Sequence, residues 1–230
     1  MAKLAFLPGV FNGVALALLT IGIQWTTVTK SSFLTTLYIV FIPTFDWIFF
    51  RTRIRWLVIG CLIAALYGAI LITRIEYGDW NSGDLLTLLC AVVASFQILY
   101  IDKMSEKITR PFVFNTFQSL YGGLVALPFA LTLENFSLPI TATPWLGIAF
   151  LSLGVCIVAF TIQIRSQKIL PSTTVSMFFL LESPIATFFA WLFFQEVMGW
   201  DQVLGALLIL AAAFGTIMKR SEPPASPASA

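Results

Sequence analysis

The chain has 230 residues, of which 59% are hydrophobic and only 10% are charged, and its formal net charge is +2. A mean hydropathy of +0.93 and a charged fraction far below the roughly 25% of soluble domains exclude a soluble globular domain, a disordered chain and a nucleic-acid-binding protein. Continuous apolar runs about 20 residues long predict an all-α, polytopic membrane helix bundle whose first partner is the lipid bilayer.

Eight apolar runs follow one another along the chain, and each is predicted to be one transmembrane helix. They cover residues 5–26, 32–50, 56–73, 85–101, 111–131, 143–162, 173–194 and 200–218. The short segments between them hold Gly, Pro, Asn, Asp and charged residues, which favour turns. The last ten residues, 221–230, are rich in Pro, Ser and Ala, a composition that predicts a disordered tail.

The lysines and arginines predict the orientation of these spans. If the N-terminus is cytoplasmic, eleven of the thirteen lie in the inner loops, and only Lys30 and Arg74 lie outside. Positive residues collect on the cytoplasmic side of membrane proteins. We therefore expect both termini in the cytoplasm and the chain in the cell inner (plasma) membrane.

Residue types that hold metals and cofactors are scarce. The chain has no histidine, and Cys61, Cys90 and Cys156 lie far apart in apolar runs without CxxC spacing. These cysteines are expected to be small packing residues. The sequence predicts no cofactor, no metal site and no nucleotide-binding P-loop.

Two segments of the chain resemble one another. Residues 31–43 read SSFLTTLYIVFIP and residues 172–184 read STTVSMFFLLESP, so that Pro43 matches Pro184. Each segment leads into an aromatic run and then a span that contains glycine. Spans one to three thus echo spans six to eight, five spans later and in the opposite direction across the membrane. Inverted repeats of this kind are typical of secondary transporters.

The ordered motifs resemble the EamA family of the drug/metabolite transporter superfamily. The matching pieces are Glu182 and Pro184 in one helix, Glu196 after an aromatic run, Gly205 in the last helix, and the segment 83–103. The resemblance implies two inverted repeats, with residues 1–76 as a partial first repeat of three helices and residues 83–220 as a complete second repeat of five. Relative to that family the chain lacks the two opening helices.

The resemblance also implies a function. We expect a secondary active transporter, not an enzyme, that moves a small metabolite or drug by alternating access, with ion or proton coupling. The missing helices leave two alternatives open: a non-transporting partner subunit, or a truncated fragment. They also suggest a homodimer, or a second chain that supplies helices. An intramembrane aspartyl protease would need Asp46 and Asp84 to face each other, but they are predicted at opposite boundaries of the bilayer.

Five residues are the candidates for a substrate or proton pathway. Glu182 lies about ten residues into the seventh span, where a charge is costly and often functional. Pro184 and Pro43 free backbone carbonyls that can line a cavity. Asn115 and Gln118 share one face of the fifth span by i,i+3 spacing and are expected to line the cavity near Glu182. The alternative for Glu182 is a protonated or hydrogen-bonded structural carboxyl.

Other polar residues within the spans are given structural roles. Asp46 is expected to pair with Arg51 or to reach the boundary, and Glu196 to start a loop. The remaining amides are expected to join helices: Asn12, Gln24, Gln97, Gln163 and Gln167. The small residues of Gly9-x-x-x-Gly13 predict close packing within the chain rather than dimerisation.

Overall fold

A computed structural model of the chain describes residues 1–52, 56–73, 80–133, 142–194 and 199–218. These residues form helices and short turns, without a strand among them. The predicted tail 221–230, Glu196 and half of the segment between the two predicted repeats lie outside the described residues.

All eight predicted spans are helical where the structure describes them, and three of them are interrupted. The second span is broken at Leu37, the seventh at Leu180 and Leu181, and the sixth contains a π-helical stretch. The elements are α1 (Ala2–Gly22), α2 (Val28–Thr36), α3 (Tyr38–Phe50), α4 (Trp56–Thr73), α5 (Ser82–Met104), η1 (Ser105–Lys107), α6 (Pro111–Leu133), α7 (Ala142–Phe150), η2 (Leu151–Ala159), α8 (Phe160–Ser166), α9 (Ser172–Phe179), α10 (Glu182–Phe194) and α11 (Trp200–Met218).

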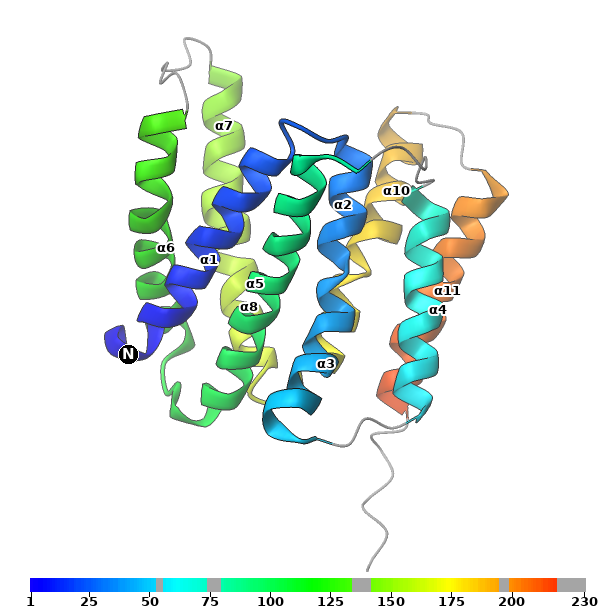
Figure 1. Cartoon of the computed structure of the whole chain (residues 1–230), viewed down its shortest axis with the longest axis horizontal. Helices are drawn as coiled ribbons and strands as arrows, with labels where there is room; N and C mark the ends of the chain where they lie inside the picture. The colour runs from blue at the N-terminus through cyan, green and yellow to red at the C-terminus, as the bar shows by residue number, and fades with distance from the viewer. Residues whose placement is uncertain (53–55, 74–79, 134–141, 195–198, 219–230) are drawn as a thin grey trace, which may run out of the picture.

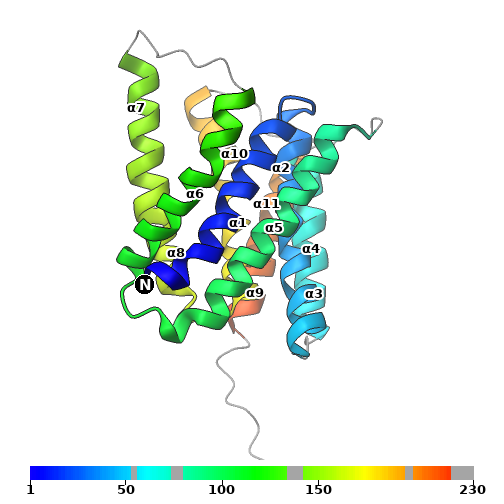
Figure 2. The same cartoon turned by 60° about the vertical axis from the view of Figure 1, so that its left-hand side comes forward.

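The helices stand side by side in one bundle (Figure 1). Helix α1 packs between α5 and α6, α5 also packs on α2 and α3, and α4 packs along α11. Helix α1 begins and α11 ends at the same end of the bundle, here called the near end, and the opposite end is called the far end. Helix α7 lies beside α6 in Figure 1 and at the edge of the bundle in Figure 2.

Glycines bring two pairs of helices into close contact. A Cβ on Gly13 would lie 2.5 Å from the Gly122 carbonyl oxygen of α6, and one on Gly9 would lie 2.6 Å from the Cβ of Tyr121. On the other side of the bundle, a Cβ on Gly68 of α4 would lie 2.7 Å from the carbonyl oxygen of Gly205 in α11. Only glycine permits these approaches, and the predicted intrachain role of Gly9 and Gly13 is confirmed.

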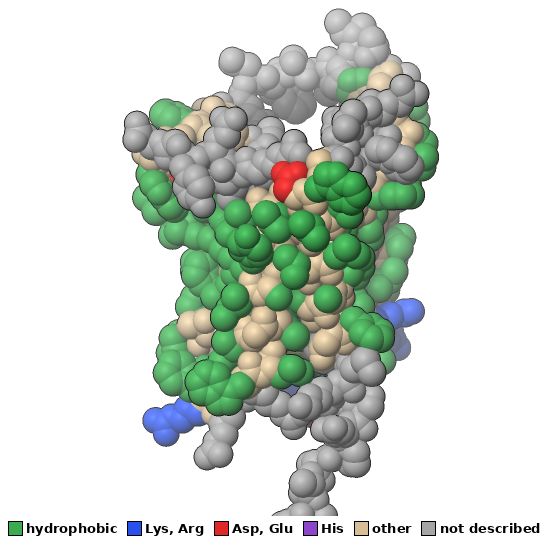
Figure 3. Space-filling model, turned by 90° about the vertical axis from the view of Figure 1, so that its right-hand side faces the viewer, with side chains coloured by type: hydrophobic (Ala, Val, Ile, Leu, Met, Phe, Trp, Pro, Cys, Tyr) green, Lys and Arg blue, Asp and Glu red, His purple; other side chains and the backbone are tan. Residues whose placement is uncertain are grey.

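The surface of the bundle is that of a multi-pass membrane protein. Four described helical stretches are long and apolar enough to cross a bilayer, and Trp56–Ile72 and Trp200–Gly215 are shorter apolar helices. The four are Ala2–Gly22, Lys30–Phe50, Ser82–Lys107 and Thr143–Ser166. Figure 3 shows hydrophobic side chains over the middle of one face and Lys and Arg side chains at its lower edge, which is the near end.

Candidate functional site

Two of the predicted site residues, Glu182 and Pro184, lie where the seventh span is broken. Proline has no N–H and would leave the carbonyl four residues earlier without its helical partner. For Pro184 that residue is Leu180, which is one of the two turn residues between α9 and α10. The break therefore follows directly from Pro184, as the sequence suggests. Glu182 becomes the first residue of α10, at the positive end of the helix dipole.

The second span is broken in a similar place. Leu37 separates α2 from α3, and Pro43 is buried inside α3. The residue four positions before Pro43 is Ile39, which lies two residues beyond the break. A discontinuity thus accompanies the proline in each of the two similar segments.

The two breaks meet inside the bundle. Tyr38 is the first residue of α3 and Phe179 is the last of α9, and their rings lie edge to face with centroids 6.3 Å apart. Glu182 follows Phe179 by three residues and is exposed at the bundle surface. This meeting point of two discontinuous helices, defined by Tyr38, Phe179 and Glu182, is called the break junction.

Asn115 and Gln118 are buried on α6 and lie apart from the break junction. The Asn115 amide donates to the carbonyl oxygens of Cys156 at 2.6 Å and Ile157 at 3.3 Å, and to the Thr161 hydroxyl at 3.1 Å. These acceptors lie in or next to the π-helical stretch of the sixth span, where the hydrogen-bond ladder is altered. Asn115 thus holds η2 and α8 against α6.

Gln118 lies next to an apolar cluster at the near end of the bundle. At the near end, side chains from α1, α5, α6 and α8 form a buried cluster of Ala5, Ile101, Ile108, Phe114 and Ile164. Three polar residues lie on the same helix faces as this cluster, one helical turn farther from the near end. Gln97 is four residues from Ile101, Gln118 is four residues from Phe114, and Thr161 is three residues from Ile164. These three residues, together with Asn115, are called the amide layer.

The amide layer keeps unused hydrogen-bonding capacity. The buried atoms Asn115 Oδ1, Gln118 Oε1 and Gln97 Nε2 have no hydrogen-bond partner among the described residues. An unpaired buried polar atom costs roughly 1–3 kcal/mol, and water or a polar ligand can satisfy it. Water, or a polar group that both donates and accepts hydrogen bonds, would satisfy these atoms. Among the described residues, no hydrogen bond joins this layer to Glu182.

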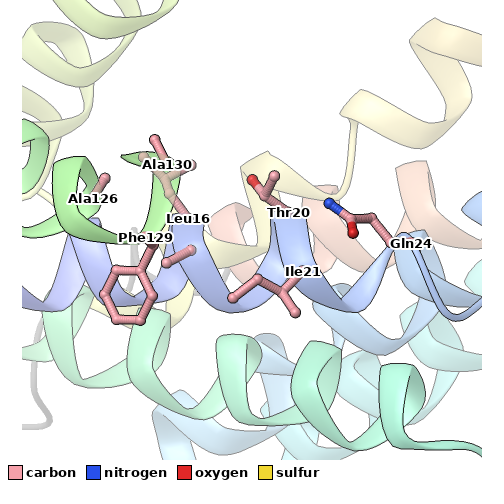
Figure 4. A pocket seen from close by; sticks show the side chains of 8 residues that line it. Leu16, Thr20, Ile21, Gln24, Ala126, Phe129 and Ala130 are labelled. Carbon is pink, nitrogen blue, oxygen red and sulfur yellow. The ribbon is translucent and has the colours of Figure 1, made fainter. Parts of the chain in front are cut away.

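A cavity of about 100 Å³ lies between α1 and α6 toward the far end (Figure 4). Apolar side chains form most of its lining, and Thr20 of α1 and Gln24, two residues beyond the end of α1, contribute polar groups. Gly9 of α1 packs against Gln118 of the amide layer. Thr20 lies eleven residues beyond Gly9 and is therefore about 16 Å farther along α1 than the amide layer. Thr20 could not be predicted as a lining residue, since one threonine in an apolar span carries no distinct signal.

Two ion pairs that the sequence did not predict join α5 to the broken second span. At the far end the Lys30 ammonium donates to the Asp84 carboxylate, which also accepts from the Thr26 hydroxyl. At the near end Lys103 pairs with Asp46 at 2.6 Å. Asp46 was expected to pair with Arg51, and the structure corrects the partner: the carboxylate is held by α5 and by the Thr52 hydroxyl, which donates at 2.7 Å.

Known proteins resemble this chain in sequence and fold. The model of the EamA-like transporter family matches residues 81–218, more than half of the chain. An uncharacterised transporter of Archaeoglobus fulgidus is 26% identical over 211 residues, which is 91% of this chain and 67% of that protein. The uncharacterised transporter YetK of Bacillus subtilis is 24% identical over 229 residues, which is 95% of this chain and 69% of that protein.

A crystal structure with 15% sequence identity has the same fold. It superposes with a TM-score of 0.73 over 96% of this chain and 89% of the other. At this identity the likeness concerns the helical architecture alone.

Proposed function

Because the chain belongs to the EamA-like transporter family, we propose that it is a secondary active transporter which moves a small metabolite or drug by alternating access. The observation that carries this proposal is the break junction. Discontinuous helices line the binding sites of many secondary transporters, because their free backbone groups and helix ends can bind substrates and ions. Here two such helices meet through Tyr38 and Phe179.

Glu182 is the proposed coupling residue. It is the first residue of α10, at the break itself, and no salt bridge to it occurs among the described residues. A carboxyl at a helix break can bind a proton on one side of the membrane and release it on the other. The amide layer, with Gln118 and Asn115, would contact the polar part of the substrate, and Pro43 and Pro184 would keep the two breaks open.

Replacing Glu182 with glutamine tests this assignment. The amide keeps the size of the side chain but cannot titrate, so Glu182→Gln should abolish solute movement driven by a pH gradient in proteoliposomes. Exchange of solute without a gradient should persist, because binding and helix movement do not require the proton. The matched control is Glu106→Gln, which removes an exposed carboxyl at the near end. Gradient-driven transport by Glu182→Gln at the wild-type rate would rule out the coupling role.

The proposed orientation puts the near end in the cytoplasm. The described residues Lys3, Lys103, Lys107 and Arg110 all lie in segments that end or begin there, and positive residues favour the cytoplasmic side. A single cysteine in place of Lys107 should react with an impermeant maleimide in inside-out vesicles of the inner membrane and be protected in intact cells. The reverse result would invert the orientation.

One observation favours the alternative of a partner subunit. Only 6% of the most apolar window of Thr143–Ser166 is buried within the bundle. A chain that leaves one span this bare can depend on a second polypeptide for activity. In that case the purified chain alone would show neither gradient-driven transport nor exchange.

A further inference from the structure

The loops that lead into the two broken spans occupy equivalent positions in the two similar segments. Residues 26–31 (TTVTKS) lead into α2, and residues 167–172 (QKILPS), which lie 141 positions later, lead into α9. The same separation relates Pro43 to Pro184. Figure 2 shows α2 toward the far end of the bundle and α9 toward the near end, so the two loops lie at opposite ends.

The far loop is bound to the first turns of α5. The Thr26 hydroxyl and the Lys30 ammonium both donate to the Asp84 carboxylate, each at 2.5 Å. One turn farther along α5, the hydroxyl oxygens of Ser31 and Thr87 lie 3.5 Å apart. Ser31, Asp84 and Thr87 are at most 1% exposed, so these contacts are shielded from water. These five residues are called the far anchor.

The near loop is bound to the opposite end of α5. The Gln167 side-chain amide donates to the Ile98 carbonyl oxygen at 2.9 Å, and the Asp102 carboxylate accepts from the backbone N–H and the hydroxyl of Ser172. Gln167 and Ser172 are 2% and 1% exposed. These four residues are called the near anchor. Because Ser172 is the equivalent of Ser31, matching serines of the two loops bind the two ends of one helix.

Between the two anchors, α5 also supports the break junction. The Ser95 hydroxyl donates to the Tyr38 carbonyl oxygen at 3.4 Å. The rings of Tyr38 and Phe179 both pack against a buried apolar cluster that includes Ile98 and Leu99 of α5. Hydrogen bonds of this kind between side chains and neighbouring helices stabilise membrane bundles. One helix therefore contacts the break junction and the start of both broken spans.

The halves beyond the breaks are held in other ways. Helix α10 packs on α11 and α4. Helix α3 is joined to the near end of α5 by the pair of Asp46 and Lys103, whose side chains are 17% and 27% exposed. The carboxylates of the two anchors, Asp84 and Asp102, are eighteen residues apart, or about 27 Å along α5. This spacing approaches the roughly 30 Å of the hydrocarbon core, so each anchor lies near one boundary of the bilayer.

We propose that α5 is the frame on which the break junction is held, and that Asp102 and Gln167 are positioning residues which keep α9 on this frame when α3 separates from α5. The observation that carries this proposal is the match between the two loops, because equivalent residues of both similar segments bind a single helix. Rigid elements joined at a few flexible residues are the usual parts of such a movement. The inference concerns the packing of the chain and does not depend on transport.

Distances between pairs of spin labels on the full-length chain in lipid vesicles test this proposal. The three cysteines are first replaced by alanine, and single introduced cysteines then carry the labels. Leu89 of α5 is the common reference, Ile169 reports the near loop and Ile48 reports α3; these side chains are 42%, 73% and 52% exposed. Asp46→Ala should add a longer distance between Leu89 and Ile48, because α3 loses its ion pair with Lys103. It should leave the distance between Leu89 and Ile169 unchanged.

Variants of the near anchor should show the complementary pattern. Asp102→Ala removes the acceptor of Ser172 and should add a longer distance between Leu89 and Ile169. Asp102→Asn keeps an acceptor oxygen and should retain the wild-type distance, which separates hydrogen bonding from a general loss of packing. Gln167→Met keeps the side-chain length without the N–H donor, and it provides the same test if Asp102→Ala does not fold.

The matched control is Glu106→Gln, which removes an exposed carboxyl at the near end and should change neither distance. If the distance between Leu89 and Ile169 keeps its wild-type value in both Asp102→Ala and Gln167→Met, the near anchor does not position α9. If Asp46→Ala lengthens this distance together with the distance to α3, then α9 moves with α3 and not with α5. Either result would overturn the proposal.

Discussion

The two ends of the contact between α5 and the broken second span are held by ion pairs of different character. At the far end, Asp84 is fully buried and Lys30 is 16% exposed at their side chains. At the near end, Asp46 and Lys103 are 17% and 27% exposed. The charges are also reversed, because the cation lies on α2 at the far end whereas the anion lies on α3 at the near end.

The far pair is embedded in a larger hydrogen-bond network. The Asp84 carboxylate also accepts from the backbone N–H of Asn81 at 3.0 Å, while the Asn81 side chain accepts from the N–H of Asp84 at 2.9 Å. This capping box starts α5, and Lys30 additionally lies over the Trp80 ring at 5.8 Å. Among the described residues, the near pair is supported by the Thr52 hydroxyl, which donates to Asp46, and by the contact of Lys103 with the Phe50 ring at 4.4 Å.

The difference indicates which end can open. Exposed ion pairs contribute about 0–1 kcal/mol, whereas removing one partner of a buried, hydrogen-bonded charge is far more destabilising. Leu37 interrupts the helix between α2 and α3, and we expect the two halves to move separately. We therefore expect α3 to leave α5 at the near end while α2 stays fixed at the far end.

The largest effect should come from Asp84→Ala. This change removes the buried carboxylate that accepts from the Lys30 ammonium and the Thr26 hydroxyl, and it removes the capping box of α5. We expect the free energy of unfolding to fall by about 2–3 kcal/mol, measured by denaturation with SDS in mixed micelles. A loss below about 0.5 kcal/mol would show that the far end is not the fixed point.

An apolar double variant separates the ion pair from simple truncation. Lys30→Met with Asp84→Leu replaces both charges by apolar side chains of similar volume and leaves no charge unpaired. Such replacements are often neutral, so the double variant should recover most of the stability lost in Asp84→Ala. If it is as unstable as the single variant, the capping box and not the ion pair fixes this end.

Much of the fold could be predicted from the sequence, because hydrophobic runs of membrane length leave few alternatives to a helix. The eight spans and the intrachain packing of Gly9 and Gly13 were predicted. For Pro184 only a freed backbone carbonyl was predicted, not the helix break beside it. The break at Leu37 was not predicted, since it lies six residues before Pro43 and depends on how α2 and α3 pack on α5. No pattern in residues 151–159 indicates a π-helix, whose formation is tied to the Asn115 contacts.

The side-chain partners were harder to predict than the helices. Asp46 was paired with Arg51 because they are close in sequence, but its partner Lys103 lies on another helix. Lys30 and Asp84 were both placed at the outer boundary, yet 54 residues separate them and only the packing of α2 on α5 joins them. Asn115 was expected beside Glu182, and the structure instead binds it to the backbone of the sixth span.

The smallest effect on stability should come from Asp46→Ala at the near end. The side chains of this pair are 17% and 27% exposed, and the cation that remains, Lys103, can turn toward water, so the free energy of unfolding should change by less than about 1 kcal/mol. The same change should, however, favour separation of α3 from α5. A cysteine in place of Phe45, whose ring stacks on Phe96 of α5 with centroids 4.6 Å apart, should then react faster with a maleimide in the Asp46→Ala background, whereas Asp84→Asn should not have this effect. Equal labelling rates in the two backgrounds would mean that the near pair does not hold the second span closed, and the two ends would have to be regarded as equally fixed.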